Sequence, residues 1–313
     1  MGLPAKPTYL YLTAIPDRLS ALVGAECVAL TGSAPNAHGI AISEHRVDVR
    51  RGAYLKSCIE VLFETGSLTE LCADIQSAGL HADEFRVSVV KKPRSLKVNS
   101  MELARDIGSA IGGRANLNSP QFTFIAVLTA EKIWFGRLLS ESDSMWLAHN
   151  QRPYVTSSSL PARLARVLVN LVARPGDSLL DPCCGTGTIV MSAAHSGIRA
   201  VGYDLNLRMI GATTKNLQHF GLTADVALGD ARQVQGQFDA IATDLPYGIN
   251  LTKDNSQDAE ILANLRTCAP KAGFIDLRDL SKPLNDLGYQ IETILPVPKL
   301  SIVRRIFITS VID

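Results

Sequence analysis

The sequence lacks the features that mark several large classes of protein. Charged or polar residues interrupt every apolar run well before the roughly 20 residues that a membrane-spanning helix needs. No signal peptide is visible, because residues 1–7 lead directly into a strand-like segment, Tyr9 to Leu12. The six cysteines have neither Cys-x-x-Cys spacing nor neighbouring histidines, which argues against a zinc site and a disulfide framework. We therefore expect no membrane span, no metal and reduced thiols in the cytoplasm.

An excess of charge is also missing, since 31 basic residues nearly balance 30 acidic ones among the 313 and the net charge is +1. One exception is local: residues 86–97 hold five basic residues and no acidic one. Taken alone, this stripe is either a solvated surface loop or a surface that binds the phosphates of a nucleic acid.

The second half of the chain alternates strand-like and helix-like segments. The expected strands are residues 177–181, 200–204 and 238–244. A helix from Met209 to Phe220 is ended by Gly221. This alternation predicts an α/β fold with a doubly wound parallel sheet. Strand-like runs at 289–295 and 305–311, with no helix between them, predict an antiparallel hairpin that closes the sheet.

The first half has short strands around amphipathic helices, which predicts an α+β region. The expected strands are residues 9–14, 86–90 and 123–128. A helix is expected from about Ser100 to Ile111, and Met101 and Trp134 are expected in the core. The polar segment 140–159 predicts the boundary between the halves.

The strongest motif is Asp-Pro-Cys-Cys-Gly-Thr-Gly-Thr at residues 181–188, where a strand leads into a helix. Glycines permit a tight turn and a close approach of a ligand, and the helix N-terminus offers free N–H groups. By itself the motif could also serve a dinucleotide or a simple turn. A nucleotide-phosphate loop is disfavoured because no Gly-Lys-Ser/Thr follows.

Acidic residues follow the next strands as well. Asp204 is placed to accept hydrogen bonds from ribose hydroxyls, and Asp230 follows a further strand. Either alone could be a helix cap or a turn residue. Together with Asp181 they occupy successive carboxyl ends of strands, the edge at which open parallel sheets bind ligands.

The motif Asp244-Leu245-Pro246-Tyr247 follows the last predicted parallel strand. The lone pair of an exocyclic base amine is delocalised into the ring. A carboxylate and a backbone carbonyl that accept both amine hydrogens direct this lone pair toward a methyl donor. Proline fixes the turn, and an aromatic ring can stack on an extruded base. The motif therefore predicts methyl transfer to a base amine.

Together these residues resemble the THUMP-domain tRNA guanine-N2 methyltransferases, in particular the archaeal-type enzymes for the guanosine at position 10. The resemblance implies a Rossmann-like class I methyltransferase domain, S-adenosylmethionine as methyl donor and tRNA as partner, and it favours a monomer. It also favours RNA contact by the basic stripe. The implied parts are a ferredoxin-like domain at 1–64, a THUMP-like RNA-binding domain at 65–140, a linker at 141–159 and the methyltransferase domain at 160–313.

The resemblance assigns roles residue by residue. The catalytic residues are then Asp244, Leu245, Pro246 and Tyr247. The residues expected around S-adenosylmethionine are Ser159, Asp181, Cys184, Gly185, Thr186, Gly187, Asp204, Leu205, Asp230 and Ala231. The residues expected to contact RNA are Lys91, Lys92, Arg94, Lys97 and Arg152.

Other interpretations stay open. The amine could belong to guanine N2 in ribosomal RNA or adenine N6 in DNA, and Leu245 stands where the position-10 enzymes most often have proline. A non-catalytic RNA-binding protein with a methyltransferase fold is the alternative from another class. The presence of Asp204, Asp230 and Asp244 argues against it. His149 and His195 are isolated in the sequence and are assigned no catalytic role.

Overall fold

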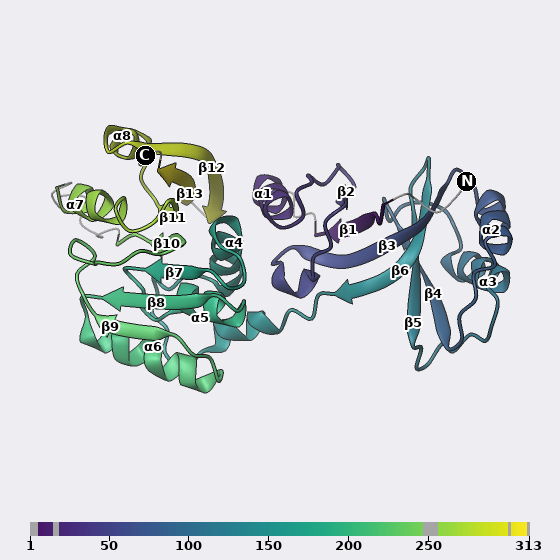
Figure 1. Ribbon diagram of the computed structural model, residues 1–313, viewed down its shortest axis with the longest axis horizontal. Coiled ribbons are helices and arrows are strands. Elements are labelled where there is room, and N and C mark those ends of the chain that lie inside the picture. Colours follow the sequence, from purple (N-terminus) through teal and green to yellow (C-terminus); the bar gives the residue numbers. More distant parts are fainter. Residues whose placement is uncertain (1–5, 15–18, 247–255, 300–301, 312–313) are drawn as a thin grey trace. The chain divides into compact units, whose positions relative to one another are not determined.

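The computed structural model describes residues 6–14, 19–246, 256–299 and 302–311. The chain forms two compact units, Met1–Ile15 with Cys27–Asp143 and Pro16–Glu26 with Ser144–Asp313. Each unit is organised around its own β-sheet (Figure 1). Within the described ranges, the structure contains no helix with both the length and the apolar character needed to span a bilayer.

The first unit contains a six-stranded sheet in the order β2-β1-β3-β6-β5-β4. Among the described residues of this sheet, only β4 and β5 pair in parallel. The strands are β1 (Tyr9–Thr13), β2 (Ile40–Ser43), β3 (Leu55–Thr65), β4 (Phe85–Lys91), β5 (Phe122–Leu128) and β6 (Ile133–Glu141), and the helical segments are η1 (Val49–Arg51), α2 (Leu68–Ser77) and α3 (Ser100–Ala110). Helix α1 (Ser20–Thr31) is divided between the units, with residues 20–26 in the second and 27–31 in the first. Strands from both predicted N-terminal domains share this sheet, and the division at residue 64 remains a prediction.

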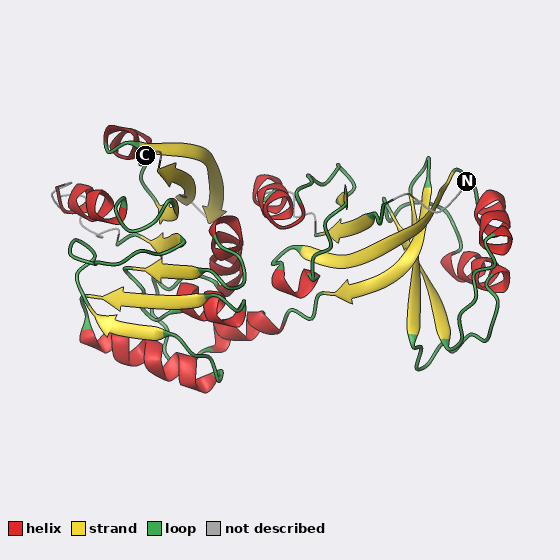
Figure 2. Cartoon of the chain, viewed as in Figure 1, coloured by secondary structure: helices red, strands yellow, loops and turns green. Residues whose placement is uncertain are grey.

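Helices α2 and α3 pack beside each other (Figure 2). Their apolar side chains are buried against aromatic residues of the sheet. Leu103 and Ile107 of α3 are buried, as their spacing predicts. Trp134 is buried as expected, but the expectation for Met101 was wrong, because its side chain is 81% exposed. Met101 is two residues from Leu103, and residues two apart lie on different faces of a helix.

The second unit contains a seven-stranded sheet in the order β12-β13-β11-β10-β7-β8-β9. Strands β11, β10, β7, β8 and β9 are parallel, while β13 runs antiparallel to both β11 and β12. The strands are β7 (Ser178–Asp181), β8 (Arg199–Asp204), β9 (Asp225–Leu228), β10 (Ala240–Asp244), β11 (Lys271–Asp276), β12 (Tyr289–Lys299) and β13 (Ile302–Val311). The predicted doubly wound sheet and its C-terminal hairpin are confirmed.

The helical segments of this unit are η2 (Met145–Gln151), α4 (Ala162–Val172), α5 (Thr188–His195), α6 (Leu207–His219), α7 (Ser256–Leu265) and α8 (Ser281–Asp286). Residues from α7 and α8 share a buried core with the central strands. The chain leaves β7 for β8 and β9, and then crosses to β10 on the other side of β7. Such a switch point leaves a crevice at the carboxyl ends of the strands, where ligands bind in open α/β sheets.

Candidate active site

A cavity of about 430 Å³ lies at this switch point. Aspartates from the carboxyl ends of three strands meet there: Asp181 from β7, Asp204 from β8 and Asp244 from β10. The complete lining is Thr156, Ser158, Ser159, Leu160, Asp181, Cys183, Cys184, Gly185, Thr186, Thr188, Ile189, Asp204, Met209, Asp244, Leu245 and Pro246. Most of the predicted donor-binding residues and the start of the predicted catalytic motif thus surround one cavity.

Residues 182–187, which we call the donor loop, connect β7 to α5. Two glycines in the loop have left-handed backbone, with φ of 52° at Gly185 and 84° at Gly187. A Cβ atom at Gly187 would lie 2.5 Å from Cγ2 of Thr213 on α6. The loop therefore requires glycine at position 187 for its conformation and for its close approach to α6.

Asp204 fixes the donor loop as well as lining the cavity. Its Oδ2 accepts a hydrogen bond from the N–H of Gly185 at 2.9 Å, and its Oδ1 accepts one from the N–H of Asn206 at 2.8 Å. Each carboxylate oxygen has a second lone pair for a ligand. Asp204 therefore holds the loop while offering acceptors to hydroxyl groups in the cavity.

Asp181 is almost completely buried and joins β7 to β10. Its Oδ1 accepts hydrogen bonds from the Thr243 hydroxyl at 2.9 Å and from the N–H of Cys183 at 3.3 Å. The pKa of Asp181 is raised to about 7, mainly by burial and also by the nearby Asp244 and Asp204. The two hydrogen bonds act in the opposite direction and lower this pKa. Two hydrogen bonds do not replace the hydration that this carboxylate loses.

We expect this buried carboxyl to make stability depend on pH. Because its pKa is raised from 3.8 to about 7, the folded state binds the proton more tightly, and the free energy of unfolding falls as pH rises between these values. Asp181→Asn retains an acceptor oxygen and cannot ionise. Its stability relative to wild type should rise by on the order of 3 kcal/mol from pH 4 to pH 7. Urea unfolding at several pH values measures this difference, and a constant difference would contradict the prediction.

The predicted catalytic motif begins where β10 ends. The N–H of Leu245 donates to the carbonyl of Ile275 on β11 at 3.0 Å, and the Leu245 side chain is 2% exposed within the core of the unit. This anchors the backbone directly after Asp244. Pro246 also lines the cavity, whereas Tyr247 lies outside the described residues.

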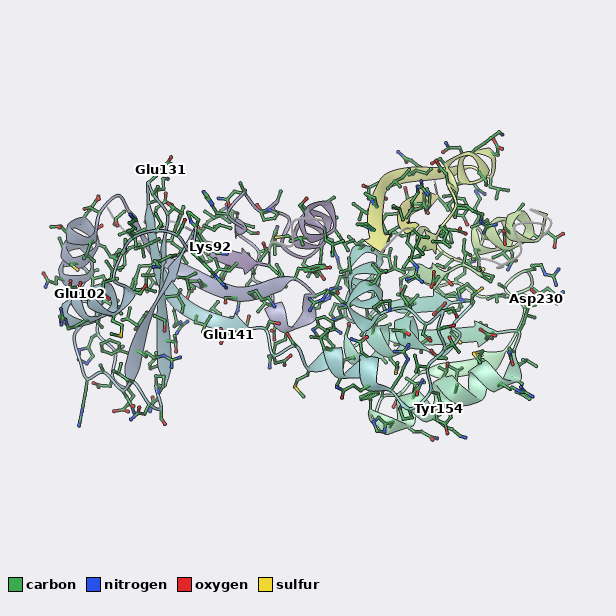
Figure 3. The ribbon with its side chains drawn as sticks, turned by 180° about the vertical axis from the view of Figure 1, so that it is seen from behind. Lys92, Glu102, Glu131, Glu141, Tyr154 and Asp230 are labelled. Atoms are coloured by element: carbon green, nitrogen blue, oxygen red, sulfur yellow. The ribbon has the colours of Figure 1, made fainter. Side chains whose placement is uncertain are left out.

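Four predicted donor-binding residues do not line the cavity: Gly187, Leu205, Asp230 and Ala231. Asp230, which is labelled in Figure 3, binds the Arg232 guanidinium through both carboxylate oxygens, and this lowers the pKa of the carboxyl. Ala231 is buried and its carbonyl accepts from Asn264 at 3.0 Å, while the Leu205 side chain is 69% exposed. The acidic residue after β9 is thus neutralised by a neighbouring cation instead of facing the cavity with Asp204.

Arg152, expected to contact RNA, is 4% exposed. Its Nη1 donates to the carbonyl of His149 at 2.9 Å. His149 and His195, which the sequence places far apart, lie with their ring centres 5.1 Å apart. Burial, then the charges of His195, Arg166 and Arg152, lower the pKa of His149 to about 4. His149 and Arg152 are buried and His195 is exposed, so Arg152 has no accessible surface for RNA.

Two residues of α6 that hold the donor loop, Thr213 and Asn216, were not predicted from the sequence. The Thr213 hydroxyl donates to the Gly185 carbonyl at 2.7 Å, and the Asn216 amide donates to the Thr186 carbonyl at 2.9 Å. Both side chains are completely buried. Their spacing could have indicated this role, because residues three apart lie on one face of a helix. These two polar residues adjoin the apolar Ala212 and Leu217 in the sequence.

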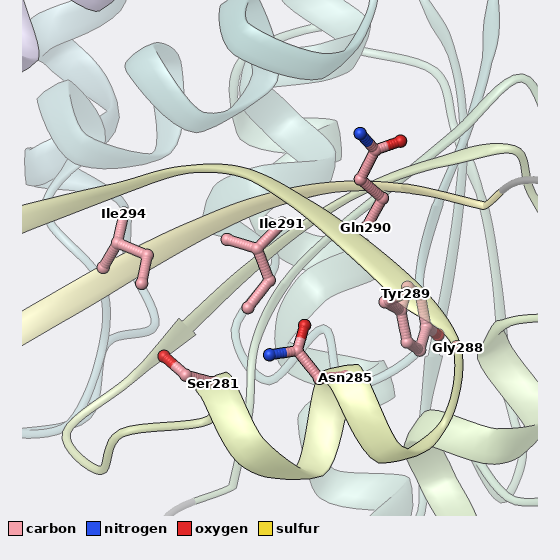
Figure 4. Close-up of a pocket in the computed structure, with 7 residues that line it drawn as sticks. All are labelled: Ser281, Asn285, Gly288, Tyr289, Gln290, Ile291 and Ile294. Atoms are coloured by element: carbon pink, nitrogen blue, oxygen red, sulfur yellow. The ribbon is translucent and has the colours of Figure 1, made fainter.

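A second hollow lies between α8 and β12 (Figure 4). Its lining residues are Ser281, Asn285, Gly288, Tyr289, Gln290, Ile291 and Ile294. No carboxylate, imidazole or thiol is among them, and the Tyr289 hydroxyl donates to the Leu262 carbonyl at 2.8 Å. Of these two hollows, the one at the switch point is lined by carboxylate and thiol groups.

The chain is similar to known proteins in sequence and in fold. Residues 149–265 match the family model described as RMKL-like, methyltransferase domain. The chain is 37% identical over 164 residues to a tRNA (guanine(10)-N2)-dimethyltransferase of Methanothermobacter thermautotrophicus, a match that covers 49% of each chain. The crystal structure of TrmN from Thermus thermophilus shares the fold, with a TM-score of 0.51 and 18% identity over 97% of this chain and 100% of that chain.

A further relative is the probable tRNA (guanine(10)-N2)-dimethyltransferase of Methanothermococcus thermolithotrophicus, which is 34% identical over 125 residues. The match covers 36% of this chain and 76% of that protein. For the Methanothermobacter enzyme and that of Pyrococcus abyssi, the matched region is 49% and 59% of the relative's length, so the chain spans between about half and three fifths of these relatives. Because the chain is 34% identical to the Methanothermococcus protein over 76% of that protein, it belongs to the family of the archaeal tRNA (guanine(10)-N2)-dimethyltransferases.

Proposed function

We propose that this protein transfers a methyl group from S-adenosylmethionine to the exocyclic N2 of a guanosine in tRNA. The observation that carries the proposal is the single cavity shared by Asp204 on the donor side and by Asp244, Leu245 and Pro246 on the acceptor side. The names of the relatives support guanosine 10 as the target and dimethylation as the outcome.

The donor side of the cavity fits S-adenosylmethionine. Its volume of about 430 Å³ is within the range of small-molecule sites, and the Asp204 carboxylate is suited to ribose hydroxyls. S-adenosylmethionine, when bound, supplies an electrophilic methyl group. Residues of the donor loop and Ser159 would surround it. Asp230 is not included among these contacts, because its carboxylate is bound to Arg232.

The acceptor side orients the amine. Asp244 would accept one hydrogen of the guanine amine and the Leu245 carbonyl the other. This arrangement aligns the nitrogen lone pair with the methyl group and excludes water from the reacting atoms. The Asp244 carboxylate also stabilises positive charge as it develops on the nitrogen. Stacking of the base on Tyr247 remains an expectation from the sequence.

The test is methyl transfer to unmodified tRNA transcript with a labelled methyl donor, followed by digestion and identification of the modified nucleoside. We expect labelled N2-methyl- or N2,N2-dimethylguanosine at position 10. Ribosomal RNA and adenine-containing DNA serve as competing substrates, and label confined to either of them would refute the tRNA assignment. Donor binding without transfer to any of the three would indicate a non-catalytic RNA-binding protein.

We further propose that the first unit is the THUMP-like RNA-binding region and that its basic loop, residues 91–97, contacts tRNA phosphates. Arg94 and Lys97 are exposed, and Lys92, which is labelled in Figure 3, is half-buried. Lys91 is different, because its Nζ donates to the carbonyls of Leu96 at 3.0 Å and Val98 at 3.3 Å. We assign Lys91 to shaping the loop and the exposed pair to RNA contact.

Removing these two exposed charges should weaken tRNA binding and reduce its salt dependence. Each lost phosphate contact should lower the slope of log affinity against log salt by about 0.7–0.9. The variant is Arg94→Ala with Lys97→Ala. Its control removes Arg105 and Arg114, exposed residues of the same unit outside the loop. Equal slopes for wild type and the loop variant would show that the loop is only solvated surface.

A further inference from the structure

Residues 154–160, which we call the strap, lie against the donor loop before α4 begins. Thr156, Ser158, Ser159 and Leu160 line the cavity from this segment. The strap belongs to no strand or helix of the unit. Its position therefore depends on the contacts that individual side chains make with it.

Asn216 of α6 holds the first end of the strap. Its Oδ1 accepts from the N–H of Tyr154 at 3.0 Å, and its Nδ2 donates to the Tyr154 carbonyl at 2.8 Å. The side chain thus pairs with both backbone groups of one residue, as a neighbouring strand would. The same Nδ2 donates to the Thr186 carbonyl in the donor loop at 2.9 Å. One buried amide therefore connects two walls of the cavity to α6.

The second end of the strap contacts the same loop residue. The Ser159 and Thr186 hydroxyls lie 3.0 Å apart, and Ser159 Oγ also accepts from the N–H of Thr156 at 2.9 Å. Asn216 thus binds the backbone carbonyl of Thr186, whereas Ser159 contacts the side chain of Thr186. The strap and the donor loop are therefore connected at both ends, and a change in one must be transmitted to the other.

We propose that Asn216 is a positioning residue that couples the strap to the donor loop and so sets the affinity for S-adenosylmethionine. The inference rests on the proposed function, since it takes this cavity as the donor site. Asn216 is not among the residues that line the cavity, so it does not contact a ligand bound there. Its loss should raise the KM for the donor and leave the chemical step intact.

The experiment measures donor affinity by calorimetry and steady-state kinetics on tRNA for wild type and Asn216→Ala. Without Asn216 the strap and the donor loop lose their fixed positions, and ordering them again on binding should raise the Kd and KM for S-adenosylmethionine on the order of 10- to 100-fold. The kcat at saturating donor should stay within about threefold, since the groups that act in the transition state are unchanged. A variant that only lost stability would show the reverse, a lower kcat through a smaller folded fraction and an unchanged KM.

Ser196→Ala is the matched control. It removes the hydroxyl that accepts from Arg166 Nη1 at 2.9 Å, at the opposite end of α5 from the donor loop. It should leave donor KM unchanged, and an increase equal to that of Asn216→Ala would overturn the proposal. If Asn216→Ala does not fold, Asn216→Asp is used, which retains the shape but loses both N–H donors. Donor affinity within twofold of wild type in a folded Asn216 variant would also overturn it.

A double-mutant cycle with Ser159→Ala tests the coupling. If both residues hold one strap, the two changes together should cost less affinity than the sum of the separate changes, because losing either contact releases the strap. Additive losses would refute the coupling. Wild-type protein that bound no S-adenosylmethionine at all would refute the proposed function instead, so the two failures are distinguishable.

Discussion

Asp244→Ala is expected to lower kcat by about 10²–10³-fold while donor affinity changes little. The donor methyl is already activated, so the enzyme mainly has to orient the amine and stabilise the charge that develops on it. The interaction between the Asp244 carboxylate and that charge is stronger in the transition state than in the ground state. Its loss therefore affects turnover more than binding. Single-turnover methylation of tRNA at saturating donor measures the effect.

Asp239→Ala is the matched control for this change. Asp239 precedes the same strand, β10, and its Oδ2 accepts from the N–H and the hydroxyl of Ser178 at 2.7 Å each. It lies at the opposite end of the strand from the cavity, so its removal should leave the rate unchanged. Methylation within a few-fold of wild type by Asp244→Ala would refute the catalytic assignment. Equal rate losses in the two variants would do so as well.

Gly187→Ala should disrupt the donor loop. Alanine with φ near the observed +84° would be strained, and its Cβ would lie 2.5 Å from Thr213 Cγ2. The left-handed conformation and the overpacking together should lower the free energy of unfolding by about 2–5 kcal/mol. If the loop shifts to relieve the contact, the Asp204 bond to Gly185 is disturbed too, so we expect a loss of donor affinity of at least about tenfold.

Gly211→Ala provides the contrast on the adjacent helix. Gly211 lies within α6 and has no heavy atom within 4 Å of the position its Cβ would take. Alanine there should raise the free energy of unfolding by about 0.5–1 kcal/mol and leave donor affinity unchanged. Urea unfolding and calorimetry give both quantities. A Gly187→Ala protein that matched wild type in stability and donor affinity would show that the loop tolerates a side chain.

The sequence predicted the second unit well because its strands are short, apolar and followed by motif residues. Asp181, Asp204 and Asp244 are the last residues of β7, β8 and β10, as their order in the sequence implied. Parallel strands bring these ends to one edge of the sheet. Ligands bind at this edge in open α/β sheets generally, so the sequence alone predicts that these three aspartates surround the ligand.

The supports of the site could not be predicted in the same way. Thr213 and Asn216 contact loop residues 28 and 30 positions earlier, and which helix face meets the loop depends on packing. Charge in the sequence does not show which side chains folding buries or pairs. Arg152 is buried, and Asp230 binds the guanidinium of Arg232 two residues away.

The place of β13 in the sheet has a consequence for how the protein is made. This strand follows all the others in sequence, yet it lies between β11 and β12 and pairs with both. During synthesis the sheet cannot close until residue 311 has emerged from the ribosome. Until then β11 has an unpaired edge, which invites pairing with other chains. A nascent chain stalled before β13 should therefore depend on chaperones, although the whole donor site has already been synthesised.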